Sequence, residues 1–214
     1  MIHLFCGYDR REAIGFHVFV HSVLSRTSAP VSIIPLAAMG LPEGSNSFTQ
    51  SRFLVPKLMR YRGHAIFADA SDMLAMGDVA ELNALFDPRF AIQVVKHADY
   101  KTRHKTKYRG TAMECPNMNY PRKNWASVCI FNCEHPAWQT VDASEPSLIG
   151  LKFLPDELIG ELPAEWNRLA DEGHPIEEAK VLHWTAGFPA FEAYRDAPAA
   201  DAWFAAKRQM ELVG

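Results

Sequence analysis

The chain has 214 residues, of which 48% are hydrophobic, 22% charged and 11% aromatic. These values are those of ordinary globular proteins and exclude a disordered, collagen-like or coiled-coil chain. The length predicts one domain over residues 1–214, and the net charge of −3 excludes a general attraction for nucleic acid. The charge is uneven, because residues 96–109 hold six basic side chains and one acid, a local excess of +5.

The cysteines and the apolar runs predict a cytoplasmic protein. Cys6, Cys115, Cys129 and Cys133 form neither a C-x-x-C pair nor a dense framework, which predicts free thiols in a reducing compartment. No basic leader precedes the first apolar run, and no apolar run reaches the ~20 residues that span a bilayer. Cys129 and Cys133 could ligate a metal with histidines, but their positions on and after a predicted strand favour small core side chains.

Hydrophobic periodicity divides the first part of the chain into alternating strands and helices. The predicted elements are strands over Ile2–Cys6, Val31–Ile34 and His64–Ala68, helices over Glu12–Arg26 and Gln50–Tyr61, and a loop over Met39–Phe48. The acidic turn Asp69–Asp72 follows the third strand. Asp78 and Glu81 then have capping-box spacing, which predicts a short helix that ends near Phe86.

The later elements are farther apart. Further strands are predicted over Phe90–Val95, Trp125–Phe131 and Lys180–Trp184. Residues 198–214 carry an apolar stripe that includes Trp203 and Phe204, which is typical of a C-terminal helix docked on the domain.

This alternation predicts an α/β fold with a Rossmann-like, mainly parallel sheet and helices on both faces. Ligands bind such sheets beyond the carboxyl ends of the strands, so the candidate ligand loops are 7–11, 69–72, 96–109 and the turn after His183. Dinucleotide, P-loop and G-x-S-x-G patterns are absent, which argues against a dehydrogenase, a phosphate-loop kinase and an α/β-hydrolase.

Two carboxylates and one histidine have the chemistry of a divalent-cation site. Asp69 and Asp72 lie on one turn, and Mn²⁺ or Mg²⁺ prefers a few carboxylates together with waters and substrate phosphates. His183 ends the last predicted strand and could complete the site, while Gly187 would let the backbone approach phosphate oxygens. The alternative is that one Asp caps the turn and His183 is a hydrogen-bonded structural residue.

Cationic and aromatic side chains fill the segments between these residues. The basic segment 96–109 either forms a solvated face or supplies lysines that neutralise charge on a leaving group. Residues 120–127 mix aromatic, amide, hydroxyl and cationic groups, as sugar recognition commonly requires, and Trp166-Asn167 repeats that mixture. Either tryptophan could instead belong to the core.

Taken in order, these segments resemble the glycosyltransferases of the GT-A fold, and among them the bacterial branch similar to glycosyltransferase family eight. The resemblance is carried by residues 6–14, 51–56, 67–74, 77–82, 96–97, 120–132, 160–167 and 183–189, and so runs through almost the whole chain. It implies a nucleotide-binding half over 1–95, a sugar and acceptor half over 96–197, and a C-terminal helix over 198–214.

The resemblance also implies the ligands and their contacts. A nucleotide-diphosphate-sugar donor, a UDP- or GDP-sugar, would contact Gly7, Tyr8, Asp9, Arg11, Arg52, Asp69, Ser71 and Gly187. Mn²⁺ or Mg²⁺ would be held by Asp69, Asp72 and His183. The transferred sugar and a hydroxyl acceptor, such as a glycan or glycolipid, would contact Lys123, Asn124, Trp125, Ser127, Trp166 and Asn167.

Two departures from the family pattern change these expectations. The family motif is Asp-x-Asp, whereas two residues separate the acids here, so either the turn contains an inserted residue or Asp72 alone matches the metal carboxylate. The family also has a lysine after the histidine, where this chain has Phe188-Pro189. Lys105 or Lys107 would replace that lysine as a catalytic cation beside Asp72 and His183.

The expected activity is transfer of a hexose from the donor to a hydroxyl, metal-dependent and, by the resemblance, with retention of anomeric configuration. The alternatives are a nucleotidyltransferase, which would release pyrophosphate, a non-catalytic nucleotide-sugar-binding protein, and a hydrolase that transfers the sugar to water.

Overall fold

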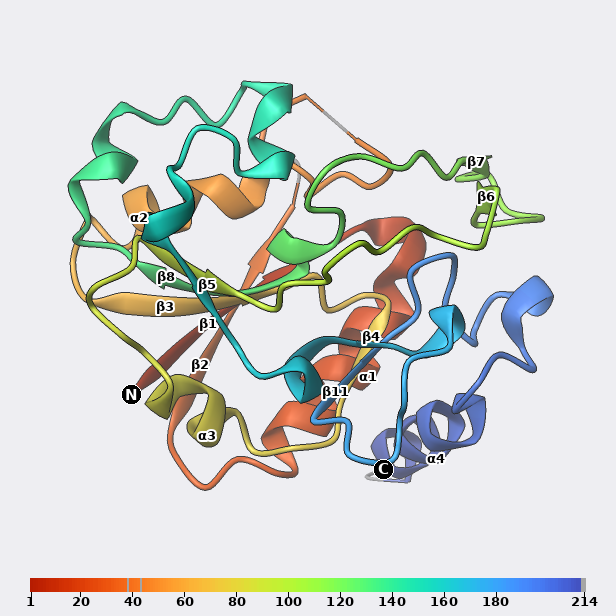
Figure 1. The fold of residues 1–214 in the computed structure, drawn as a ribbon. Coiled ribbons are helices and arrows are strands. Elements are labelled where there is room, and N and C mark those ends of the chain that lie inside the picture. Colours follow the sequence, from red (N-terminus) through yellow and green to blue (C-terminus); the bar gives the residue numbers. More distant parts are fainter. Residues whose placement is uncertain (38, 43, 213–214) are drawn as a thin grey trace.

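The computed structural model describes residues 1–37, 39–42 and 44–212. The helices are α1 (Ala13–Leu24), α2 (Val55–Leu58), α3 (Val79–Ala84) and α4 (Ala200–Glu211). The strands are β1 (Ile2–Gly7), β2 (Val31–Leu36), β3 (His64–Ala68), β4 (Met73–Ala75), β5 (Ile92–Val94), β6 (Thr106–Lys107), β7 (Cys115–Pro116), β8 (Val128–Asn132), β9 (Ile159–Glu161), β10 (Arg168–Leu169) and β11 (Val181–His183). Short 3₁₀ turns join many of them (Figure 1).

The central sheet has six strands in the order β2-β1-β3-β8-β5-β9. β1 is parallel to β2 and β3, β5 is parallel to β9, and β8 alone runs antiparallel to its neighbours β3 and β5. The predicted α/β fold with a mainly parallel sheet is therefore confirmed.

Alternate side chains of each central strand enter opposite cores, as the pleat of a strand requires. On one face, Leu4 and Ile66 pack with Phe16 and Phe19 of α1. On the other face, Phe5 and Phe67 pack with α2 and with the segments that follow β8. Helices thus cover both faces, as the alternation of strands and helices predicts.

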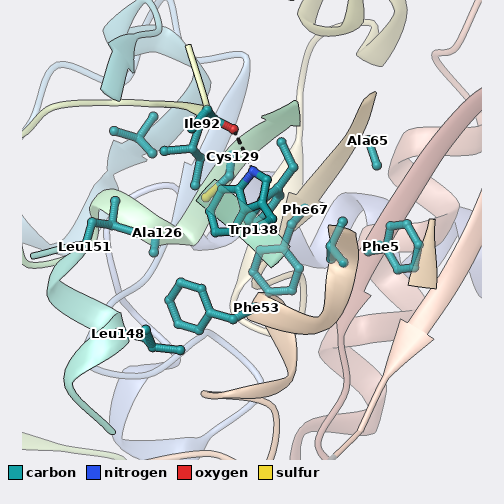
Figure 2. Close-up of a cluster of buried hydrophobic side chains, with 14 of the residues drawn as sticks. Phe5, Phe53, Ala65, Phe67, Ile92, Ala126, Cys129, Trp138, Leu148 and Leu151 are labelled. Atoms are coloured by element: carbon teal, nitrogen blue, oxygen red, sulfur yellow. Dashed lines mark hydrogen bonds between the residues drawn. The ribbon is translucent and has the colours of Figure 1, made fainter. Parts of the chain in front are cut away.

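The core on the α2 side is closed by a tryptophan from outside the sheet. Trp138 lies among Phe53, Phe67 and Cys129, and its Nε1–H donates to the Ala91 carbonyl at 3.2 Å (Figure 2). Cys129 and Cys133 are both buried and free, and burial raises their pKa values. Their place in this core fits the expectation of small apolar side chains.

A second sheet of three strands, in the order β10-β11-β4, lies beside the first. Sequence periodicity did not predict β4 or β10. It predicted the strand over Lys180–Trp184, observed as β11, without assigning its partners, and β11 pairs antiparallel with β4 and parallel with β10. Trp184 and Phe188 pack with Trp203 of α4 in a separate core beside this sheet.

Two predicted elements differ in extent. The helix expected over Gln50–Tyr61 is a 3₁₀ turn over Ser51–Leu54 followed by the four-residue α2, and positive φ angles at Arg60 and Tyr61 end it. The first three residues of the expected strand Trp125–Phe131 form a 3₁₀ turn, because Asn124 has φ of 62°.

The ends of the chain and the basic segment complete the fold. The expected helix over 198–214 is α4, and residues 213–214 lie outside the described part, as does residue 43 of the expected loop. The basic segment is not uniformly a loop, since β6 pairs with β7 in a hairpin that projects from the body of the protein (Figure 1). Among the described residues, no helix is long and apolar enough to cross a bilayer.

Candidate functional site

Asp69, Asp72 and His183 meet where the two sheets join. The turn 69–72 links β3 of the central sheet to β4 of the second sheet, and His183 ends β11 opposite Met73 of β4. The Trp184 N–H donates to the Asp72 carbonyl at 2.9 Å, which fixes the histidine beside the turn. All three side chains are buried, and one potential ligand atom from each lies within 4.8 Å of the others.

The acidic turn contains one residue with a left-handed backbone. Ala70 has φ of 66°, and the Ser71 N–H donates to the Asp69 carbonyl at 2.7 Å. Both carboxylates line the same cavity. The wider spacing of the acids therefore removes neither of them from that cavity.

Helix α1 supports this turn by a very close backbone approach. A Cβ atom built on Gly15 would overlap the carbonyl oxygen of Ser71. Only glycine therefore lets α1 pack directly against the turn that carries the two acids. The Ser71 hydroxyl itself donates to the Gly7 carbonyl, so this side chain ties β1 to the turn and does not line the cavity.

Asn167 determines which nitrogen of His183 faces the acids. The Asn167 side-chain NH₂ donates to the Asn124 carbonyl at 3.1 Å and lies 3.2 Å from His97 Nε2, so its carbonyl oxygen faces His183. That oxygen is 2.9 Å from His183 Nδ1, which must therefore carry the hydrogen. In the neutral imidazole, Nε2 then presents a lone pair toward Asp72.

The His183–Asp72 pair has the electrostatics of a cation site. Nε2 lies 3.5 Å from Asp72 Oδ2, and Asp72 Oδ1 has no hydrogen-bond partner among the described residues. Burial lowers the pKa of His183, but Asp72, together with Asp69 and Asp171, outweighs burial and raises it. Burial raises the pKa of Asp72, but His183, together with Lys107, outweighs burial and lowers it. Two facing acceptors require a proton or another cation between them, so these side chains fit Mn²⁺ or Mg²⁺.

Arg52 compensates the second acid. Its Nη1 lies 2.9 Å from Asp69 Oδ1 and donates to the Ala126 carbonyl at 2.6 Å, while Nε donates to the Thr49 carbonyl. Its guanidinium also lies 5.0 Å from the centre of the Phe67 ring. Burial raises the pKa of Asp69, and Arg52 opposes that rise. Arg52 is 3% exposed, so it lines the cavity as a buried cation paired with Asp69.

These groups surround a cavity of about 210 Å³, called the metal cavity below. Its lining consists of Ser45, Asn46, Thr49, Arg52, Asp69, Asp72, Lys107, Tyr120, Asn124, Ala126, Ser127, Ile149 and His183. Seven of these are residues that the sequence singled out, and they come from five separate segments. Of the two candidate lysines, Lys107 lines the metal cavity, whereas Lys105 is exposed and does not.

A larger cavity of about 650 Å³ adjoins the first, and it is called the second cavity below. Its lining consists of His97, Ala98, Asp99, Tyr100, Lys101, Asn119, Tyr120, Pro121, Arg122, Lys123 and Trp125. Tyr120 lines both cavities, so the two share a wall. Lys123 and Trp125 were predicted on the sugar side and lie here.

Several predicted contacts lie outside both cavities. The Asp9 carboxylate accepts from the Arg11 backbone and guanidinium and from the Ser47 N–H, which lowers its pKa to about 2 although burial acts to raise it. Tyr8 packs edge-on against Phe16 at 5.2 Å. These residues stabilise the first turn, and neither cavity is lined by them.

Four other predicted residues also pack away from the cavities. A Cβ atom on Gly7 would overlap the Phe48 ring, and one on Gly187 would meet the Tyr194 ring, so neighbouring aromatic side chains fill the space beside both glycines. Trp166 belongs to the α1-side core, under the Lys180 ammonium. Asn167 is fully buried and acts on His183 from behind.

The structure adds residues that sequence patterns did not single out. Glu12 is buried with no hydrogen-bond partner for either carboxylate oxygen among the described residues, and burial together with Asp72 raises its pKa well above the ordinary value. Asn46 and Thr49 reach the metal cavity from the loop before α2. That segment is rich in Gly, Ser and Asn, a composition that predicts a loop but does not predict which part of the protein the loop contacts.

Comparison with solved structures defines the fold. The chain superposes on the bifunctional glycosyltransferase WbbM with a TM-score of 0.63 at 15% identity, covering 96% of this chain and 49% of WbbM. It superposes on the galactosyltransferase LgtC, solved with donor and acceptor sugar analogues, with a TM-score of 0.61 at 13% identity, covering 97% and 96% of the two chains. For GlyE of Streptococcus pneumoniae the TM-score is 0.61 at 12% identity, covering 96% and 60%.

The chain therefore spans about half of WbbM and nearly all of LgtC, and it has the GT-A fold of glycosyltransferases. No protein-family profile matches the sequence. Protein CDI of Arabidopsis thaliana is 36% identical over 227 aligned positions, which cover 94% of this chain and 83% of the plant protein. The chain belongs to the family of Protein CDI.

Proposed function

We propose that the protein is a metal-dependent hexosyltransferase that moves a sugar from a UDP- or GDP-sugar to a hydroxyl acceptor with retention of anomeric configuration. We also propose that it belongs with the bacterial branch similar to glycosyltransferase family eight. The observation that carries the proposal is the metal cavity, in which Asp69, Asp72 and the Nε2 lone pair of His183 converge. A cytoplasmic location is part of the proposal and is supported by four free cysteine thiols.

The chain's own groups suit a diphosphate as well as a cation. Mn²⁺ or Mg²⁺ held by the two acids and His183 would supply Lewis-acid stabilisation of charge on the departing diphosphate. Lys107 lines the same cavity and contributes a second positive charge on that side. Asn124 and Ser127 offer amide and hydroxyl groups to sugar hydroxyls. Lys107, from the basic segment 96–109, would take the role of the lysine that the family has after the histidine. Phe188 stands in that part of this chain and is buried against Trp203, so it offers no cation.

The proposed reaction balances without a further reactant. The bond between the anomeric carbon and the diphosphate oxygen breaks, and a bond from that carbon to the acceptor oxygen forms on the same face. The hydroxyl proton ends on the nucleoside diphosphate. No side chain of the cavity is assigned as a covalent nucleophile.

The test is donor-dependent release of nucleoside diphosphate. The protein is incubated with Mn²⁺ and a panel of UDP- and GDP-sugars, with an acceptor mixture, and UDP or GDP is quantified. We expect release with one donor class, its loss on addition of EDTA, and at least a hundredfold loss in Asp72→Asn. Asp201→Asn, an exposed acid on α4, is the matched control and should retain full rate.

The products separate the proposal from its alternatives. Pyrophosphate release from a nucleoside triphosphate would identify a nucleotidyltransferase, and free sugar alone would identify a hydrolase. Calorimetric binding of donor with no turnover would identify a nucleotide-sugar-binding protein. An inverted anomeric centre in the NMR spectrum of the product would contradict retention.

A further inference from the structure

We propose that the second cavity binds the acceptor, and that this acceptor is a sugar carrying an anionic group, a phosphate or a carboxylate. The inference rests on the proposed function, because it names the acceptor class for the same transfer. The evidence for this acceptor class is the charge and the burial of Lys123 and of the residues around it.

Lys123 is a buried ammonium without an anionic partner. The side chain is 6% exposed, and its Nζ donates to the Asn117 side-chain carbonyl and to the Met118 carbonyl, both at 2.6 Å. Both acceptors are neutral, and within the described part of the chain no carboxylate lies within 4.0 Å of Nζ. A buried charge left in this state is costly, and an anionic ligand would compensate it.

Burial and the nearby Lys107 outweigh the neighbouring acid. Burial, and next Lys107, lower the pKa of Lys123 to about 8, although Glu172 acts in the opposite direction without pairing with the ammonium. Lys107 lines the metal cavity and Lys123 lines the second cavity, so two neighbouring ammonium groups belong to the two adjoining cavities. Lys101 also lines the second cavity and is exposed, and Asp99 is the single acid in that lining.

Arg122 differs from these lysines because it is already engaged. Its guanidinium donates to the Leu151 carbonyl at 2.7 Å and pairs with Asp156. Arg122 therefore shapes the cavity, whereas Lys101 and Lys123 are the groups available to an anionic ligand.

The remaining wall suits a sugar ring. The Trp125 ring lies in the lining with the Lys96 ammonium and the Arg122 guanidinium 5.8 and 5.5 Å from it. Its Nε1–H is buried without a partner among the described residues and can donate to a ligand oxygen. Tyr120 lines both cavities. A donor sugar in the metal cavity and an acceptor in the second cavity would therefore be separated by this one side chain, which would place the acceptor hydroxyl close to the donor sugar.

The experiment compares three sugars by saturation-transfer NMR and calorimetry: glucose 6-phosphate, glucuronate and the neutral methyl glucoside. Mg²⁺-loaded protein is used with saturating UDP or GDP, so that the nucleoside diphosphate occupies the metal cavity and keeps the phosphate of the sugar out of it. We expect an anionic sugar to bind at least about tenfold more tightly than the neutral one, as a charge-assisted hydrogen bond to a buried ammonium gives. The stronger of the two anionic arms identifies phosphate or carboxylate.

Variants locate the binding. Lys123→Met removes the charge and keeps the stem, and it should abolish the preference for an anionic sugar. Lys57→Met, an exposed lysine on α2, is the matched control and should leave the preference intact. If Lys123→Met does not fold, Lys101→Met on the exposed side of the cavity should still reduce the preference by about two- to fivefold.

Two results would overturn the inference: equal binding of neutral and anionic sugars, or anionic binding that disappears when nucleoside diphosphate saturates the metal cavity. The proposed function fails separately. In one case UDP and GDP do not bind even with Mn²⁺, but the preference for an anionic sugar is present in Lys57→Met and absent in Lys123→Met. Only the donor assignment is then wrong. If a donor turns over and no anionic preference exists, only the acceptor assignment is wrong.

Discussion

Replacing Asn167 by leucine tests whether this buried amide sets the metal affinity of the site. The substitution keeps the number and branching of the side-chain heavy atoms but removes three contacts, to His183 Nδ1, the Asn124 carbonyl and His97 Nε2. Without the Asn167 oxygen, the His183 hydrogen is free to move to Nε2, where the Asp72 carboxylate accepts it. A hydrogen on Nε2 occupies the lone pair that a cation needs, so the variant should bind Mn²⁺ more weakly.

The magnitude has two parts. Each buried partner left unsatisfied costs about 1 to 3 kcal/mol, and with relaxation of the site we expect a total loss of about 3 kcal/mol in the free energy of unfolding. Loss of an outer hydrogen bond to a metal-ligating histidine lowers metal affinity about ten- to a hundredfold. That factor is about 1.4 to 2.7 kcal/mol of binding free energy.

Mn²⁺ affinity is measured by electron paramagnetic resonance titration of free Mn²⁺, and the tautomer by ¹⁵N chemical shifts of the His183 ring. Gln93→Leu is the matched control, since Gln93 is 5% exposed and also makes two hydrogen bonds, to Asp87 and Leu85. It should lose about 2 kcal/mol of stability with unchanged Mn²⁺ affinity.

Asn167→Asp adds a second control, because its carboxylate still accepts from His183 Nδ1 and should retain the tautomer and most of the affinity. A folded Asn167→Leu protein that binds Mn²⁺ as tightly as the wild type would refute the assignment of the tautomer by Asn167. So would a wild-type ¹⁵N spectrum with the hydrogen on Nε2.

Three further outcomes follow from the same geometry. Arg52→Met leaves the Asp69 carboxylate buried without its cation and should cost about 3 to 5 kcal/mol in urea unfolding, with Arg52→Lys in between. Gly15→Ala forces α1 away from the acidic turn and should cost about 3 kcal/mol and weaken Mn²⁺ binding, whereas Gly150→Ala, whose Cβ would make only ordinary van der Waals contacts, should stay within about 0.5 kcal/mol. Because the pKa of Lys123 falls from 10.5 to about 8 on folding, the unfolded chain holds more protons between these values. The free energy of unfolding of the wild type relative to Lys123→Met should therefore rise with pH in that window, as urea melts at its two ends would measure.

The elements that sequence patterns predicted well are those that bury an apolar face in the central sheet. β1, β3 and α1 were predicted within two residues of their observed bounds, because their periodicity is a direct consequence of packing. β4 and β10 were missed because they have three and two residues, too few for a period to appear. The predicted helix after residue 50 was too long, because periodicity does not register the positive φ angles at Arg60 and Tyr61.

The sequence predicted which residues form the core of the candidate site, but it did not predict how all of the expected side chains are arranged. Asp69, Asp72 and His183 were identified from their chemistry and their positions after strands, and the three converge. Asp9 and Arg11 have equally suitable chemistry but satisfy each other, which depends on a side-chain geometry that no spacing encodes. Asn167 was expected to face a sugar, yet it faces His183, because the 3₁₀ turn that carries it ends against β11.

The location of the acids and the histidine explains why a motif with altered spacing can still form a site. The acidic turn belongs to both sheets at once, since β3 precedes it and β4 follows it. His183 is attached to that turn through the pairing of β11 with β4, so the distance from His183 to Asp72 depends on sheet register and not on the spacing of the acids. An additional residue in the turn would then change the turn alone, where Ala70 already has a left-handed backbone. The arrangement of the three candidate ligands is therefore a property of the junction between the two sheets, held by Gly15 on one side and by Asn167 on the other.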